Sequence, residues 1–290
     1  CMDMEGLSGV LKELARRSQL LVKRLNSYQV LLQEPVANAH ERARALAEIE
    51  KLGNGFPDGE VRQKLLAWLD SERAQVEEAK SEFRFEFGKR LVAGLEGSGL
   101  VVRGQLPVLR IGFFTIRADF ERGRATIFWG PEIEEIKSGI PLEPVGLARL
   151  VRSYQESLKA KGVREPEAFL ARLLAAYRRR CTAEGLAEGE RVLLSDLLAE
   201  LVLLSQPESF RVDPVRENFV EYPRIRFSYD LYLLKRSGVR AVAGQELRLT
   251  VANFDATAKK SRALWVPDSE EGDGTYYSYI AFVPARDTGR

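Results

Sequence analysis

The sequence predicts an α+β protein with three parts, and three observations support this reading. A 4-3 spacing of leucines near the start indicates an N-terminal antiparallel helical hairpin of coiled-coil type over residues 1–99. A change to strand patterns indicates a mixed β-hairpin and helical-bundle region over residues 100–206. A second run of alternating residues indicates a C-terminal antiparallel β-rich region over residues 207–290.

The first expected helix carries its leucines on one stripe, which is typical of an a/d seam. The spacing is interrupted at Ser18, and Pro35 ends the pattern. A seam of this length requires a partner helix, because an apolar stripe exposed to water is unfavourable. The seam leucines of this helix are Leu7, Leu11, Leu14, Leu21, Leu25 and Leu32.

A short second helix over residues 36–52 and a long third helix over residues 60–95 follow, separated by glycine and proline at residues 53–59. We expect the third helix to cover the first one in antiparallel fashion. The third helix continues the seam through Leu65, Leu69, Val76 and Phe83. Phe83, Phe85 and Phe87 together predict an aromatic core at the end of this helix.

The middle part begins with strands over residues 100–106, 108–120 and 125–129, the last two joined by a turn that contains Gly123. Helices are then expected after Pro144, after Pro166 and from Ser195 or Asp196. Three such helices form a small bundle, and a winged-helix or helix-turn-helix arrangement is compatible with their spacing.

The C-terminal part alternates apolar and polar residues over residues 224–233 and 247–251, which predicts half-buried strands. A last hairpin is expected from residues 263–266 and 275–283. The loop that joins its strands is acidic and contains Asp268, Glu270, Glu271 and Asp273.

Residues that commonly carry out catalysis are scarce. His40 is the single histidine, expected at the surface, and Cys181 is far from the only other cysteine, so catalytic triads and zinc sites are disfavoured. The glycines between Gly94 and Gly99 follow a helix and precede a strand, the reverse of a phosphate-binding loop. We therefore expect no cofactor and no metal, and a protein that is not an enzyme.

One enzymatic alternative stays open. Asp119, Glu135 and Lys137 match the acidic-x-Lys pattern of a Mg²⁺-dependent nuclease, in which carboxylates hold the metal and lysine orients water. Residues 131–136, however, suggest a helical turn, which would direct these side chains wrongly.

Nucleic-acid binding is a second alternative, based on basic residues between aromatic ones in the C-terminal part. Cations neutralise phosphates and exposed rings stack on bases. The net charge of +2 gives no global argument for a polyanionic partner, so this hypothesis depends on a local cluster. That cluster comprises Arg224, Arg226, Lys235, Arg236, Lys259, Lys260 and Arg262.

The function predicted first is that of a non-enzymatic interaction or scaffolding subunit of a cytoplasmic assembly, with the helical hairpin docking a protein partner. The hairpin could pack within one chain or between two copies, so a homo-oligomer stays open. No membrane span or signal peptide is predicted, and Cys1, directly before Met2, is expected to be a residue left by cloning rather than a lipid-carrying cysteine.

Overall fold

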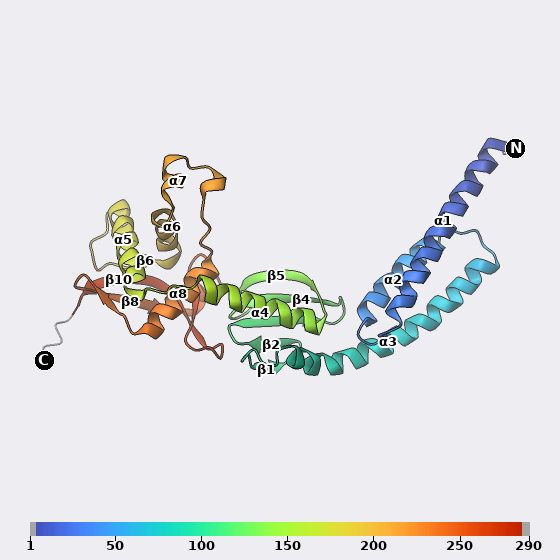
Figure 1. Ribbon diagram of the computed structural model, residues 1–290, viewed down its shortest axis with the longest axis horizontal. Helices are drawn as coiled ribbons and strands as arrows, with labels where there is room; N and C mark the ends of the chain where they lie inside the picture. Colours follow the sequence, from blue (N-terminus) through green and yellow to red (C-terminus); the bar gives the residue numbers. More distant parts are fainter. Residues whose placement is uncertain (1–3, 286–290) are drawn as a thin grey trace. The chain divides into compact units, whose positions relative to one another are not determined.

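The computed structural model describes residues 4–285, and Cys1 lies outside this range (Figure 1). The α+β class is confirmed, with helices first and antiparallel sheets after them. Within the described residues, no helix has both the length and the apolar character that crossing a bilayer would need.

Two compact units make up the chain. One holds the residues up to Glu96 together with Ala118–Ala125 and Gly139–Ala148. The other holds Gly97–Arg117, Thr126–Ser138 and the residues from Arg149 onward. The expected division at residues 99 and 206 stays a prediction.

The first unit begins with three helices, α1 (Met4–Leu31), α2 (Ala39–Gly53) and α3 (Glu60–Gly94). Sequence neighbours among them run antiparallel. The Arg17 guanidinium reaches the carbonyl oxygen of Gly55 at 3.0 Å, while further along α1 Arg24 pairs with Glu48 at 3.2 Å. Consequently α1 and α2 face each other over the length of α2.

The third helix is not the antiparallel cover of the first one, and this expectation was wrong. α2 runs antiparallel to α3 as well, because His40 at its start contacts Phe83 and Gly53 at its end lies beside Leu65. α1 and α3 therefore run in the same direction (Figure 1). The sequence did not identify α2 as the helix between the other two because α2 has few apolar residues. Ala39, Leu46 and Ile49 are almost fully buried, and Leu46 and Ile49 belong to the core that the three helices share.

The expected seam divides into a covered and an uncovered part. Leu21, Leu69, Val76 and Phe83 are buried. Leu14, Leu25 and Leu65 are half-buried. Leu7, Leu11 and Leu32 are exposed. Cover is present only where α2 and α3 accompany α1.

Aromatic residues from the second half of α3 pack together with Phe120 in the first unit. Phe83 and Phe87 are one helical turn apart and both contact Phe120, whereas Phe85 on the opposite side of α3 is 89% exposed. His40 is 8% exposed, so its expected surface position was wrong. Gly123 has a φ of +61° and lies so close to the His40 ring that a side chain there would collide with it.

Five strands form the first sheet in sequence order: β1 (Val102–Gln105), β2 (Val108–Ile111), β3 (Phe114–Asp119), β4 (Arg124–Trp129) and β5 (Glu134–Pro141). β1 pairs antiparallel with β2, and β2 pairs antiparallel with β3. The expected strands are confirmed, with an added break at Gly112, whose φ is +53°.

After α4 (Pro144–Lys161), the second unit continues with α5 (Pro166–Glu184), β6 (Val192–Leu193), α6 (Leu194–Leu204), α7 (Glu208–Val212) and η1 (Arg216–Asn218). It ends with α8 (Arg224–Ser237), β7 (Ala241–Val242), β8 (Gln245–Val251), α9 (Phe254–Thr257), β9 (Leu264–Pro267) and β10 (Gly274–Pro284).

The helices and strands of this part pack on one another. α5 packs on α6 and α8, and the sheet has the order β6-β10-β8-β7, with β9 paired to β10. α7 and η1 separate α6 from α8, and the winged-helix or helix-turn-helix arrangement stays a prediction. The last expected hairpin is confirmed as β9 and β10.

Residues 224–233 form a helix, so the strand expected there was wrong. Residues 227–232 are all buried, and a helix buried on all sides has no polar stripe from which its period can be read. Pro223 precedes the helix and Gly238, with a φ of +76°, ends it.

Candidate functional site

The first three turns of α1 present an apolar face with no cover in the described structure. Leu7 is 47% exposed, and Val10 and Leu11 are each 56% exposed. Further along the same face, Leu21 and Tyr28 are almost completely buried. The bond between Arg17 and Gly55, just beyond the end of α2, marks where the cover stops. The uncovered segment, residues 4–16, is about 20 Å long at 1.5 Å per residue. These residues define the uncovered α1 face.

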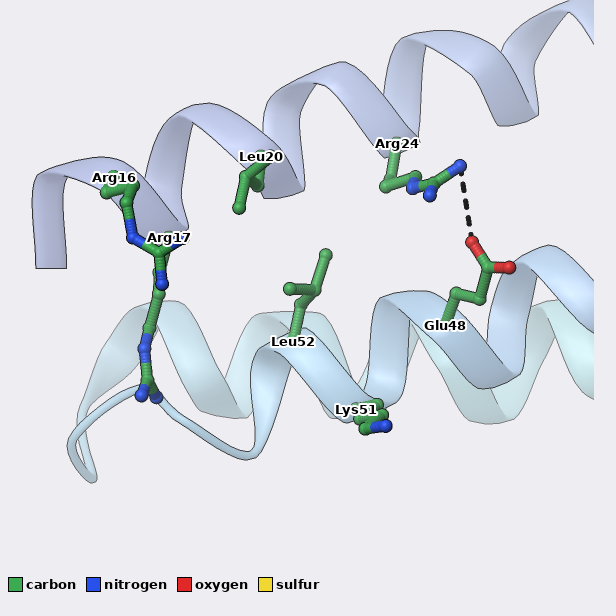
Figure 2. Close-up of a pocket in the computed structure, with 7 residues that line it drawn as sticks. All are labelled: Arg16, Arg17, Leu20, Arg24, Glu48, Lys51 and Leu52. Atoms are coloured by element: carbon green, nitrogen blue, oxygen red, sulfur yellow. Dashed lines mark ion pairs between the residues drawn. The ribbon is translucent and has the colours of Figure 1, made fainter. Parts of the chain in front are cut away.

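A groove between α1 and α2 adjoins this face and has a volume of about 470 Å³ (Figure 2). Figure 2 shows Leu20 of α1 and Leu52 of α2 pointing toward each other to form an apolar floor. Charged side chains surround this floor. They are Arg16, Arg17 and Arg24 from α1 and Glu48 and Lys51 from α2. We call this set of seven residues the α1/α2 groove.

The charge in the groove is predominantly positive. Glu13 accepts hydrogen bonds from both Arg16 and Arg17, at 2.9 and 2.8 Å. These bonds, the one from Arg16 first, lower the pKa of the Glu13 carboxyl to about 2. Glu48 pairs with Arg24 at 3.2 Å. Within residues 4–285 Lys51 has no carboxylate in ion-pair range, so four cations face two carboxylates.

A buried polar network joins the three helices, about one turn along α1 from Arg24 of the groove. The Tyr28 hydroxyl donates to the Glu72 carboxylate at 2.6 Å, and Arg42 donates to both Tyr28 and Glu72 at 3.2 Å. Burial, followed by the bond to Glu72, raises the pKa of Tyr28 to about 12. The three residues come from α1, α2 and α3, so the network aligns all three helices. This network was not predictable from the sequence, since Arg42 lies in an ordinary charged stretch.

The basic residues expected at the C-terminal surface are largely occupied. Arg224 pairs with Glu134 at 3.0 Å, and Arg226 pairs with the buried carboxylate of Asp230 at 3.0 Å. Lys235 and Arg236 pair with two residues of the acidic loop, Asp268 and Glu270. Their positive charge is therefore compensated.

The cations after β8 differ from those on α8. Lys259, Lys260 and Arg262 are all exposed, and only Lys260 has a carboxylate in ion-pair range within the described residues, Glu134 at 3.4 Å. Phe254, which the sequence did not single out, lies in the same segment of the chain and is 89% exposed. Asn253 caps the short helix α9 through the amide of Ala256 at 2.9 Å. We call residues 252–263 the basic wing.

The helix α8 is not free to enter a nucleic-acid groove. The Trp129 indole donates to the Ser228 hydroxyl at 2.8 Å, and Phe113 contacts Tyr229 and Tyr232. Strand β9 packs on the same helix. A helix that reads duplex DNA lies exposed in the major groove, whereas α8 is buried over residues 227–232.

The three residues of the nuclease hypothesis do not form a metal-ligand cluster. Asp119 caps a turn by accepting hydrogen bonds from the amides of Glu121 and Arg122. Glu135 and Lys137 are exposed on β5, so the helical turn expected over residues 131–136 was wrong. Among residues 4–285 there is no group of three His, Cys, Asp or Glu side chains that could hold a metal ion.

Comparison of the chain with protein-family models, with curated proteins and with solved structures finds no match. The surfaces of the chain that bear on its function are the uncovered α1 face, the α1/α2 groove and the basic wing.

Proposed function

We propose that the protein is a non-enzymatic interaction subunit that docks a protein partner on its N-terminal helices. The observation that carries this proposal is the uncovered α1 face, where an amphipathic helix continues past the elements that bury the rest of its stripe. An apolar helix face of this kind is completed by another helix.

The docking free energy that this face can supply is moderate. Complete burial of a leucine or valine side chain contributes about 1.5–3 kcal/mol, and these side chains are already about half covered by their own helix. Leu7, Val10 and Leu11 would thus contribute roughly 1 kcal/mol each, or about 3 kcal/mol together. Further contacts are needed for a stable complex, and the adjoining groove offers them.

The buried network of Tyr28, Arg42 and Glu72 makes the docking surface rigid. Because each helix contributes one side chain, sliding or separation of any helix would leave a buried charge or hydroxyl unpaired. A pre-organised surface loses less conformational entropy on binding than a flexible one.

The test uses the full chain with both Leu7→Asp and Leu11→Asp, in affinity capture from the source cell with quantitative mass spectrometry. The matched control carries Lys12→Asp and Gln19→Asp, two new carboxylates on the opposite side of α1. We expect a specific partner to be depleted at least tenfold in the leucine variant and retained in the control. Equal capture by both variants would contradict docking on this face.

Self-association is a separate outcome of the same test. Light scattering measures the mass of the chain in solution, where a dimer that dissociates on Leu7→Asp and Leu11→Asp would assign the face to a second copy. A monomer assigns it to a different protein.

Nucleic-acid binding by the basic wing is a second candidate function. The supporting observation is that one segment, residues 252–263, carries the exposed Phe254 ring together with Lys259 and Arg262, neither of which has an ion-pair partner in the described structure. An exposed ring stacks on bases and free cations neutralise phosphates, which suits a single strand. The buried α8 is the reason that duplex reading is not proposed.

A further inference from the structure

We propose that the α1/α2 groove binds an acidic amphipathic helix of the partner, with apolar side chains on the leucine floor and carboxylates against the surrounding cations. This inference deepens the proposed docking function and rests on it, because it names the chemistry of the partner segment.

The shape of the groove suits side chains projecting from a helix. Leu20, 40% exposed, and Leu52, half-buried, face each other across the floor and leave space above them (Figure 2). Filling this space with apolar side chains would remove both leucines from water. Helices that dock into apolar grooves use residues spaced at i, i+3, i+4 and i+7 in this way.

The positions of the cations define the spacing of the partner's charges. Arg16 and Arg24 are eight residues apart on α1, about 12 Å along the helix axis, with Leu20 midway between them. Lys51 lies across the groove on α2. A partner helix with carboxylates about two turns apart, and leucines between them, would match this arrangement.

Charge complementarity selects an acidic partner over a basic one. Arg16 and Arg17 share the single carboxylate of Glu13, which has already released its proton over the physiological range. Lys51 has no carboxylate in ion-pair range in the described part of the chain, so additional carboxylates would be attracted. A basic segment would be repelled, and a nucleic acid would leave the leucine floor without apolar cover.

The other exposed surfaces do not identify the chemistry of a partner. In the pocket that Lys235 and Arg236 line, both cations are already paired, with Asp268 and Glu270. The exposed apolar residues of the segment between α6 and α8, such as Val212 and Val220, have no neighbouring charge pattern that identifies a partner. In the α1/α2 groove, by contrast, the apolar floor and the charges together specify the chemistry of a partner.

The experiment measures binding of a defined probe to the full chain by fluorescence anisotropy. The probe is a labelled helical peptide of about 18 residues, or five turns, with leucines at i, i+4, i+7 and i+11 and glutamates beside them. A matched peptide has lysine in place of every glutamate. We expect the acidic peptide to bind at least tenfold more tightly, and its affinity to fall as salt rises.

Variants of the chain localise the binding. Arg16→Glu with Lys51→Glu should weaken the acidic peptide at least tenfold, and Leu20→Ser with Leu52→Ser should weaken both peptides. The control variant, Lys64→Glu with Lys89→Glu, makes the same charge change on α3 and should stay within twofold of the parent. Circular dichroism and thermal unfolding show that each variant keeps its fold.

Two results would overturn the inference. One is equal binding of the acidic and basic peptides, or binding of neither. The other is binding that the control variant weakens as much as the groove variant does. If the Leu7→Asp and Leu11→Asp chain loses a partner that the groove variants retain, the docking function stands and the groove assignment fails.

Discussion

The Arg42 guanidinium lies 3.2 Å from the Glu72 carboxylate, and only 2% and 12% of the two side chains are exposed. This pair joins α2 to α3, and the Tyr28 hydroxyl of α1 binds to both partners. Every helix of the N-terminal group therefore contributes to one buried polar cluster. Because the cluster joins α1 to both other helices, its integrity controls the position of α1.

Replacement of Arg42 by methionine leaves the Glu72 carboxylate buried without its cation. We expect the free energy of unfolding to fall by about 3–5 kcal/mol, the range seen when one partner of a buried pair is removed. Urea denaturation followed by circular dichroism measures this loss. The matched control is Arg73→Met, which breaks the exposed pair with Glu50 and should cost less than about 1 kcal/mol. Equal losses in the two variants would contradict the role given to burial.

The two halves of the α1 stripe should respond differently to the same truncation. Leu21→Ala removes a side chain that is 6% exposed, so we expect the free energy of unfolding to fall by about 2–5 kcal/mol. Leu11→Ala removes a side chain that is 56% exposed, and it should change the free energy of unfolding by less than about 0.5 kcal/mol. Both chains are compared by urea denaturation. A large loss at Leu11 would mean that this face is covered in the isolated chain.

His40 should make stability depend on pH. Burial first, then the charges of Lys80 and Arg44, lower its pKa, while Glu77 and Asp119 act in the opposite direction. The unfolded chain, with a histidine pKa of about 6.5, binds a proton that the folded chain does not. The contribution of neutral His40 to the free energy of unfolding is therefore fully present above about pH 6.5, and it decreases as the pH falls below that value.

The measurement compares urea midpoints of the parent and of His40→Phe at pH 7.5 and pH 5.5. We expect the parent midpoint to be lower at pH 5.5 and the variant midpoint to change much less. Exposed carboxylates titrate mainly below about pH 4.5. Burial raises the pKa of the Asp230 carboxyl, but Asp230 is present in both chains, so its contribution cancels in the comparison. An equal decrease in both chains would assign the effect to other groups.

The basic wing should bind single strands in a salt-dependent manner. Lys259→Gln with Arg262→Gln removes two cations, so the slope of log affinity against log salt should become shallower by about 1–2 for a labelled oligothymidine. Phe254→Ala should weaken binding by about 1–3 kcal/mol without changing the slope. Lys159→Gln with Lys161→Gln, at the end of α4, is the matched control. Binding that none of these changes affects, or no binding by the parent, would exclude the wing.

The sequence was informative where periodicity is tied to a single buried face. The three N-terminal helices, the strands after Gly99 and the final hairpin could be predicted because their apolar residues recur at helix or strand spacing and because proline and glycine separate them. The order of packing was not predictable in the same way. A stripe shows that a helix needs cover, but it does not identify which later helix provides it.

The α8 segment shows a second limit. Ile225, Phe227, Tyr229 and Leu231 alternate as in a strand, yet the residues between them include Ser228 and Asp230, which are buried with hydrogen bonds. In the sequence, polar residues that are buried with hydrogen-bond partners look the same as polar residues on the solvent-exposed face of a strand. The ion pairs of Arg226 and Lys235 were not predicted either, since their partners become neighbours only after folding.

The central claim is that the first turns of α1 have no cover in the isolated chain and gain one from a partner helix. Amide hydrogen exchange along α1, measured by mass spectrometry with and without the acidic peptide, tests it most directly. We expect residues 8–16 to exchange at least a hundredfold faster than residues 21–31 in the isolated chain and to slow at least tenfold with the peptide bound. Equal protection along the whole helix in the isolated chain would contradict the account, whereas exchange at residues 8–16 that the peptide leaves unchanged would contradict cover of this face by a helix bound in the groove.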